Sequence, residues 1–126
     1  MTAEEIVDAF TARITALDFD GAFELVADDI EYDNVPIGKV SGPEGIRGVF
    51  ATLDAMGVNG MEWTVHRQVA NATTVMNERT DSFSAGDRRA AVDVVGVFEV
   101  ADGRITLWRD YFDMTAMNEA ITALAG

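Results

Sequence analysis

One arginine and two aspartates are the residues whose types and spacing best suit proton-transfer chemistry. Arg79 and Asp81 are two positions apart in segment 77–83, which has the composition of a β-strand, so both side chains should leave the same face. Asp110 lies in a second strand-like segment among aromatic residues, where a carboxylate needs a partner. If these strands meet, one guanidinium would hold two carboxylates, and in a low-dielectric pocket one of them keeps a proton. Such a pair supplies both an acid and a base.

By their spacing alone, Arg79 and Asp81 fit a structural ion pair across the sheet better than a catalytic site. Tyr32 and Asn34 change this balance because they share one face of a short predicted strand. Their neutral donor and acceptor atoms could orient one water molecule without changing the local charge. Together with Asp110, they favour a catalytic site.

The composition predicts one compact domain covering residues 1–126, since 48% of the 126 residues are hydrophobic. The net charge of −13 makes nucleic acid and anionic membrane surfaces unfavourable partners. The absence of cysteine excludes disulfides, zinc–thiolate sites and a cysteine nucleophile. The first residues lack the features of a signal peptide, and no apolar stretch is long enough to span a bilayer, so we expect a cytoplasmic protein.

The pattern of apolar residues predicts helices first, then strands, then a closing helix. Thr2 and Glu5 have the spacing of a capping box ahead of the first helix, and a second, short helix should reach Val26. A short strand, 30–35, should end in a loop. The remaining expected elements are a third helix, 41–56, four strands, 61–70, 73–83, 90–100 and 104–112, and a closing helix, 114–124.

This order predicts an α+β domain in which helices pack on one face of a curved sheet. Turn-like residues between the last four strands, including Asp102-Gly103, predict an antiparallel meander. A curved sheet backed by helices can enclose a pocket, and large apolar side chains are candidates to line it, although most such residues simply fill a core. The candidate substrate-binding residues are Phe50, Met61, Trp63, Phe83, Phe98, Trp108 and Phe112.

Two further titratable residues lie in the predicted strands. His66 belongs to the polar run 64–68, which favours a surface or edge position over catalysis. Asp93 interrupts the apolar segment 91–95, where a buried aspartate is unusual. It would serve either as an ion-pair partner for a neighbouring strand or as a polar group in the pocket.

Four short motifs resemble the limonene-1,2-epoxide hydrolase family, whose cone-shaped α+β fold is shared with nuclear transport factor 2, ketosteroid isomerase and polyketide cyclases. The motifs follow the family's order along essentially the whole chain. They are Tyr32-Asp33-Asn34-Val35-Pro36, Glu78-Arg79-Thr80-Asp81, Gly96-Val97-Phe98 and Trp108-Arg109-Asp110-Tyr111-Phe112-Asp113. The resemblance implies a nuclear transport factor 2-like (SnoaL-like) cone, with a curved mixed β-sheet and N-terminal helices packed on its concave face.

The resemblance also implies an activity and a role for each site residue. It implies a hydrolase that converts a small apolar epoxide to a vicinal diol without a metal or cofactor. Asp110 would be the general base on water, Asp81 would protonate the epoxide oxygen, and Arg79 would bridge the two. Tyr32 and Asn34 would hold the attacking water. The family resemblance and an apolar sheet face further imply a homodimer.

Two other functions stay open because this fold hosts many. A ketosteroid-isomerase-like or polyketide-cyclase-like enzyme would shuttle a proton next to a carbonyl with one aspartate, and would not need an arginine between two aspartates. A non-catalytic ligand-binding or dimerisation module would saturate the polar cluster with internal ion pairs and leave no room for water.

Overall fold

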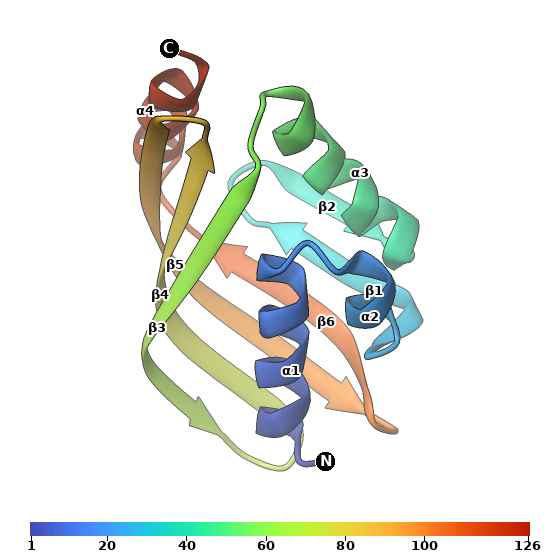
Figure 1. Ribbon diagram of the computed structural model, residues 1–126. Coiled ribbons are helices and arrows are strands. Elements are labelled where there is room, and N and C mark those ends of the chain that lie inside the picture. Colours follow the sequence, from blue (N-terminus) through green and yellow to red (C-terminus); the bar gives the residue numbers. More distant parts are fainter.

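The computed structural model describes residues 1–126 and contains one six-stranded sheet with four helices. The elements in chain order are α1 (Ala3–Thr15), α2 (Phe19–Phe23), β1 (Val26–Asn34), β2 (Gly38–Ser41), α3 (Gly42–Ala55), β3 (Gly60–Ala70), β4 (Thr74–Ala85), β5 (Arg88–Ala101), β6 (Arg104–Tyr111) and α4 (Met114–Ala125). The strands lie in the order β2-β1-β6-β5-β4-β3, and every neighbouring pair is antiparallel except β1 with β6. Figure 1 shows the sheet curved, with α1, α2 and α3 covering its inner face and α4 beside the end of the β4–β5 hairpin. The predicted α+β class with a curved mixed sheet is confirmed.

Helix α1 begins at the predicted position because Thr2 caps it. The Glu5 N–H donates to Thr2 Oγ1 at 3.1 Å, and the Thr2 N–H donates to Glu5 Oε1 at 2.8 Å. The apolar stripe of this helix is buried against the sheet and consists of Ile6, Val7, Phe10 and Ile14.

Trp108 on β6 lies at the centre of the core beneath these helices. It is fully buried, its ring stacks on Tyr32 with centroids 3.9 Å apart, and Phe10 of α1 meets it edge-on at 5.2 Å. Phe98 on β5 stacks from the other side at 5.9 Å. Such aromatic contacts add to the stability gained from burial. The core therefore fixes the inner faces of β1 and β6, which carry Tyr32 and Asp110.

Segment 24–41 differs from the prediction. The second helix ends at Phe23 rather than reaching Val26, where β1 already begins. The expected loop after β1 instead returns as β2, which pairs with β1 so that Asn34 lies opposite Gly38. Gly38 has a φ of 143°, a conformation that side-chain-bearing residues avoid, so it permits the tight return.

The turn between β5 and β6 forms where Asp102-Gly103 predicts it. Both residues have positive φ, 53° and 76°, as a two-residue hairpin turn of the primed type requires. β6 then ends at Tyr111, one residue earlier than expected, and Asp113 caps α4 by accepting a hydrogen bond from the Ala116 N–H at 3.1 Å.

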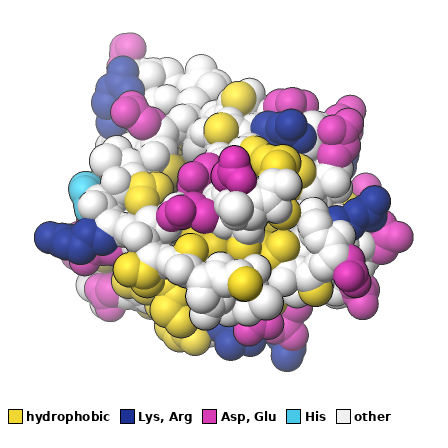
Figure 2. Space-filling view, turned by 90° about the horizontal axis from the view of Figure 1, so that it is seen from below, with side chains coloured by type: hydrophobic (Ala, Val, Ile, Leu, Met, Phe, Trp, Pro, Cys, Tyr) yellow, Lys and Arg dark blue, Asp and Glu magenta, His cyan; other side chains and the backbone are white.

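Acidic side chains dominate the charged surface, in line with the net charge of −13. Figure 2 views the molecule from the end at which α1 begins, and acidic side chains gather near the centre of this view while basic ones lie towards its rim. None of the four helices combines the length and apolar character that a membrane span requires.

Candidate active site

Arg79 on β4 is the centre of a buried polar cluster. Its Nε and Nη2 donate to Oδ1 and Oδ2 of Asp81 at 3.0 and 2.9 Å, and Nη2 also donates to Asp110 Oδ2 at 3.2 Å. The remaining Nη1 donates to Asn77 Oδ1 at 2.9 Å. All four side chains belong to buried residues, and Arg79 has no exposed surface. One planar guanidinium thus binds two carboxylates and one amide, which a lysine ammonium cannot do in the same geometry.

Gly96 on β5 makes room for this cluster to cross the sheet. β5 lies between β4 and β6, and Gly96 is the register partner of Asn77 on one side and of Asp110 on the other. A Cβ at Gly96 would overlap Arg79 Nη1 and would lie 2.8 Å from Asn77 Oδ1 and 3.1 Å from Asp110 Oδ1. The absent side chain therefore gives the guanidinium its path from β4 to Asp110.

Tyr32 and Asn34 form a polar wall beside Asp110. β1 runs parallel to β6, with Asn34 opposite Asp110 and Tyr32 opposite Trp108. Trp108 Nε1 donates to Asp110 Oδ1 at 2.9 Å, while the other oxygen of Asp110 accepts from Arg79. Asp110 is consequently held at both oxygens, next to the neutral polar groups of β1.

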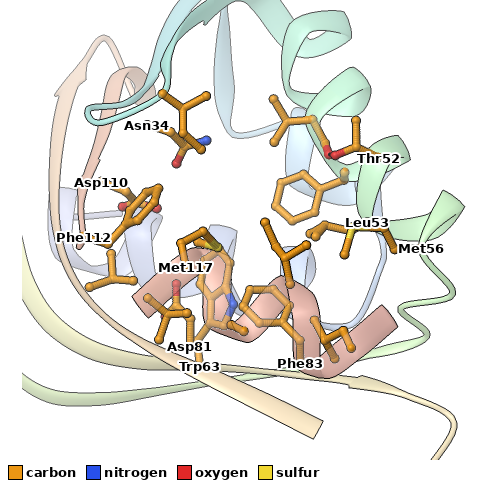
Figure 3. A pocket seen from close by; sticks show the side chains of 18 of the residues that line it. Asn34, Thr52, Leu53, Met56, Trp63, Asp81, Phe83, Asp110, Phe112 and Met117 are labelled. Atoms are coloured by element: carbon orange, nitrogen blue, oxygen red, sulfur yellow. The ribbon is translucent and has the colours of Figure 1, made fainter. Parts of the chain in front are cut away.

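A cavity of about 170 Å³ opens over the cluster. Of its 19 lining residues 15 are hydrophobic, and Tyr32, Asn34, Asp81 and Asp110 supply polar groups. In Figure 3 the polar ends of Asn34, Asp81 and Asp110 point into the cavity, and side chains of α3, including Leu53, form the opposite wall. The site is an apolar chamber with a polar region.

Burial shifts the ionisation of the groups in this region. It raises the pKa of Asp110 to about 6, against the opposing effect of the Arg79 charge and with a further increase from Asp81. Burial also raises the pKa of Asp81, opposed by the hydrogen bonds and charge of Arg79. Burial and the Asp110 charge raise the pKa of Tyr32, so its hydroxyl keeps its proton.

The guanidinium stays charged despite its burial. Burial lowers the pKa of Arg79, but the Asp110 and Asp81 carboxylates outweigh this effect and raise it overall. Two carboxyls with raised pKa values around one fixed cation can divide acid and base roles near neutral pH. No group of three or more His, Cys, Asp or Glu side chains is arranged to hold a metal ion.

Comparison with known proteins places the chain in a family. The family model described as the limonene-1,2-epoxide hydrolase catalytic domain matches residues 1–123. This chain belongs to the limonene-1,2-epoxide hydrolase family. Epoxide hydrolase EphG of Mycobacterium tuberculosis is 41% identical over 111 residues, which make up 88% of this chain and 73% of that protein. A solved M. tuberculosis LEH-like epoxide hydrolase matches with a TM-score of 0.77 and 39% identity, covering 94% of this chain and 87% of that one.

More distant structures share the fold of this limonene-1,2-epoxide hydrolase family member. A protein of ketosteroid isomerase-like fold from Catenulispora acidiphila, in complex with trimethylamine, matches with a TM-score of 0.79 and 24% identity, covering 97% of this chain and 95% of that one. Similarity at this level shows the fold alone. The predicted family, its cone-like fold and the epoxide hydrolase class are confirmed, whereas these similarities do not test the roles of individual residues.

Four of the seven predicted substrate-binding residues border the cavity of this epoxide hydrolase family member, namely Phe50, Trp63, Phe83 and Phe112. The other three are not among the residues that line it. Phe98 and Trp108 are fully buried in the core beside α1, and Met61 borders two separate hollows. Alternation along a strand predicts which face a residue occupies, but not whether a helix or a cavity covers that part of the face.

Sequence reasoning missed the helix residues that form the far walls of the cavity. They are Val49, Thr52 and Leu53 on α3, Met56 at its C-terminal cap, and Met117, Ala120, Ile121 and Leu124 on α4. Helical spacing predicts an apolar stripe but does not distinguish a stripe that packs from one that borders a cavity. Asn77 was also missed, although its two-residue spacing from Arg79 places it on the same strand face.

Asp93 and His66 lie on the outer face of the sheet, away from the cavity. Thr80 Oγ1 donates to Asp93 Oδ1 at 3.0 Å and lies 2.8 Å from His66 Nε2, and both titratable residues are exposed. Asp93 therefore does not make the pocket polar, because its neighbours Val92 and Val94 are the residues that face the cavity.

Proposed function

We propose that this protein opens a small, largely apolar epoxide by adding one water molecule in one step. Asp110 is the general base, Asp81 is the general acid, and Arg79 is shared between them. The observation that carries this proposal is that Arg79 Nη2 lies 2.9 Å from Asp81 Oδ2 and 3.2 Å from Asp110 Oδ2. A single cation that grips both carboxyls can hold the pair with one proton between them.

Asp110 is suited to the role of base by its neighbours and its pKa. Asn34 is its register partner on β1, and Tyr32 carries a protonated hydroxyl in the same wall. These groups can hold a water molecule against the carboxylate. A pKa of about 6 leaves Asp110 mostly ionised at pH 7 and still basic enough to accept a proton.

Asp81 is suited to the role of acid because Arg79 can adjust to its protonation. A proton on Asp81 Oδ2 makes this oxygen a weaker acceptor for Nη2, and Nη2 can then bind the Asp110 carboxylate more strongly. The hydrogen bond from Nε to Asp81 Oδ1 is kept. The guanidinium thereby stabilises ionised Asp110 at the moment when Asp81 is neutral.

The proposed step balances protons and electron pairs without a cofactor. The water oxygen forms a bond to one epoxide carbon as Asp110 accepts a water proton. The carbon–oxygen bond of the epoxide breaks, its electron pair moves to the oxygen, and that oxygen takes the proton of Asp81. The product is a vicinal diol, and return of a proton from Asp110 to Asp81 restores the pair.

The cavity supports a small and apolar substrate. Its volume of about 170 Å³ lies below the roughly 300 Å³ at which pockets for drug-sized ligands begin. Hydrophobic side chains from α3, α4 and the sheet surround most of it. The only carboxyls that an epoxide would meet in this chamber are those of Asp81 and Asp110.

The two rival functions have less support. An isomerase or cyclase needs one base and one oxyanion donor, so a guanidinium shared between Asp81 and Asp110 has no part to play in it. A non-catalytic module requires a polar cluster without free space beside it, whereas both carboxyls border a cavity.

We further propose that the protein forms a homodimer through the outer face of the sheet. Val69, Met76, Val95 and Tyr111 are exposed there, at 68%, 46%, 46% and 44%. Apolar surface of this kind is typical of protein interfaces. Sedimentation equilibrium should give twice the chain mass for the wild type and the chain mass for Val95→Glu, and a monomeric wild type would refute the dimer.

A single-turnover experiment in oxygen-18 water tests the reaction. Excess enzyme is mixed with a panel of aliphatic, cyclic and aryl epoxides, and the diols are analysed by mass spectrometry after chiral chromatography. Direct attack of water puts one labelled oxygen into the diol in the first turnover. An unlabelled first-turnover diol would reveal an ester intermediate on a carboxylate, and no diol from any epoxide would refute the proposed substrate class.

A further inference from the structure

A continuous chain of hydrogen bonds runs from Arg79 to the surface at the start of α1. Arg79 Nη1 donates to Asn77 Oδ1 at 2.9 Å, and Asn77 Nδ2 donates to Gln68 Oε1 at 3.1 Å. Gln68 Nε2 then donates to Glu4 Oε2 at 3.1 Å and to Asp8 Oδ1 at 3.0 Å. Asn77 is buried, Gln68 is half-buried, and the two acidic residues are exposed, so the chain leads from the buried guanidinium to solvent.

The two ends of this chain set the direction of every hydrogen bond in it. An ionised carboxylate only accepts and a guanidinium only donates. Gln68 must therefore turn its NH₂ group towards Glu4 and Asp8, which leaves its oxygen for Asn77. Asn77 must then donate its own NH₂ group to Gln68, which leaves its oxygen for Arg79. Only one orientation of the two amides satisfies all partners, so Nη1 meets an acceptor of fixed position.

A β-bulge in β3 places Gln68 in this chain. Thr64 faces outward, and strict alternation would put Gln68 on the same outer face. The register shifts between Val65 and Arg67, so Gln68 instead lies opposite Asn77 on the inner face. α1 packs against β3 here, and Figure 2 shows acidic side chains gathered where this helix begins.

We propose that Asn77 and Gln68 are positioning residues, which hold Arg79 at the rotation that shares Nη2 between Asp81 and Asp110. The inference rests on the carboxyl roles of the proposed function. With Nη1 fixed by Asn77 and Nε fixed by Asp81, the planar group is not free to turn Nη2 away from Asp110. If Asn77 releases Nη1, the guanidinium can turn towards Asp81 alone, and Asp110 loses its cation.

The charged and titratable groups around Asp110 are few, so the loss of its contact with the Arg79 cation can be measured. Arg79 and Asp81 face it from β4, and Tyr32 faces it from β1. The α3 and α4 residues that line the cavity carry no charge, and Glu4 and Asp8 of α1 lie at the far end of the chain. Arg79 is therefore the one cation beside Asp110, and loosening it should raise the pKa of Asp110.

Asn77→Asp is the direct test in the full-length protein. The new side chain still accepts from Nη1, but it cannot donate to Gln68, so the position of this acceptor is no longer fixed. It also adds a third carboxylate to Arg79. We expect kcat to fall about tenfold with KM little changed. The acid limb of the kcat pH profile should also move up by about one unit, because the added charge and the divided cation both disfavour ionised Asp110.

Gln68→Met is a second test of the positioning role, and Asn71→Asp is the control for the added charge. Methionine at the half-buried position 68 removes the acceptor for Asn77, and we expect kcat to fall about fivefold, the worth of one hydrogen bond, with an upward shift of the acid limb. Asn71→Asp adds the same charge to the exposed β3–β4 turn, where Asn71 lies opposite Thr74, about 10 Å along β4 from Asn77. Its oxygen can still accept from the Thr73 and Thr74 N–H groups, so kcat and the acid limb should not change.

A carbon-13 NMR titration of the aspartate carboxyls gives a readout that does not depend on turnover. The pKa of Asp110, assigned with Asp110→Asn, should be higher than in the wild type both in Asn77→Asp and in Gln68→Met, which adds no charge. If the pKa shifts in this way but the wild type hydrolyses no epoxide, the proposed function is refuted and the positioning role stands. A fall in kcat without any shift of the acid limb would make Asn77 merely structural.

Gln68→Met provides the test if Asn77→Asp does not fold. A wild-type kcat together with a wild-type acid limb in Gln68→Met would overturn the proposal.

Discussion

A side chain on Gly96 would occupy the space that Arg79 uses to reach across the sheet. Its Cβ would overlap Nη1 of the guanidinium, which is fully buried and has no room to withdraw. Gly96→Ala should therefore lower kcat by about 100-fold or more and reduce thermal stability, since overpacking a buried site costs roughly 1–3 kcal/mol.

Gly48→Ala is the matched control for that substitution. Nothing lies within 4 Å of a Cβ at Gly48, which is exposed in α3. Alanine there should raise stability by about 1 kcal/mol through its helix propensity and leave kcat unchanged. Wild-type kcat in Gly96→Ala would show that the guanidinium does not need this passage.

The pH dependence of turnover should have an acid limb near pH 6. Burial raises the pKa of Asp110 to about 6, and the proposed base works only when ionised, so kcat should fall as the pH drops below that value. The acid, Asp81, must be protonated, so a second fall is expected at higher pH. Initial rates measured from pH 4 to 10 test this, and a rate that stays flat from pH 4 to 7 would exclude Asp110 as the base.

Asp110 should also cost the protein stability at neutral pH. Its folded pKa of about 6 exceeds the ordinary value of 3.8, so the folded state binds this proton more tightly. Stability is therefore lost as the pH rises from about 4 to 6, and the loss is complete above 6. Asp110→Asn removes this loss, so its stability relative to the wild type should increase between pH 4 and pH 8 by on the order of 1 kcal/mol.

Urea denaturation at both pH values measures that difference. The exposed turn residue Asp87 provides a control, because Asp87→Asn removes the same charge outside the buried cluster. A relative stability of Asp110→Asn that is equal at pH 4 and pH 8 would mean that Asp110 ionises in the folded protein as it does in water.

Much of the site follows from two-residue spacing in the sequence. Arg79 and Asp81 share a strand face for that reason, as do Tyr32 and Asn34. The approach of Asp110 to Arg79 is not a local property, because it depends on β5 lying between β4 and β6 and on a glycine at the crossing point. The predicted meander already puts β5 between β4 and β6, but the alignment of Gly96 with Asp110 cannot be obtained from periodicity.

Other features escaped prediction for equally specific reasons. The bulge in β3 reverses the facing of Gln68, and alternation assumes that no such residue is inserted. β2 is four residues long and contains Gly38 and Lys39, which strands do not favour, so pairing with β1 rather than propensity makes it a strand. Trp108 has the composition of a pocket wall but is covered by Phe10 of α1.

Loss of either proposed catalytic carboxyl should be severe but not additive. Asp81→Asn and Asp110→Asn keep the shape of each side chain while removing acid or base, so each should lower kcat by roughly two to four orders of magnitude. Both groups act in one transition state, so the double variant should lose far less than the product of the two single losses. Losses that multiply would indicate that the two carboxyls act in separate steps.

Turnover by Arg79→Lys tests most directly whether one guanidinium must serve both carboxyls. Lysine keeps the positive charge but lacks the planar fork that donates to Asp81 and Asp110 together. We expect kcat on an epoxide hydrolysed by the wild type to fall by about 100-fold or more, with only a modest fall in melting temperature. Wild-type kcat in Arg79→Lys would contradict the shared-guanidinium mechanism and leave the cluster as a structural ion pair.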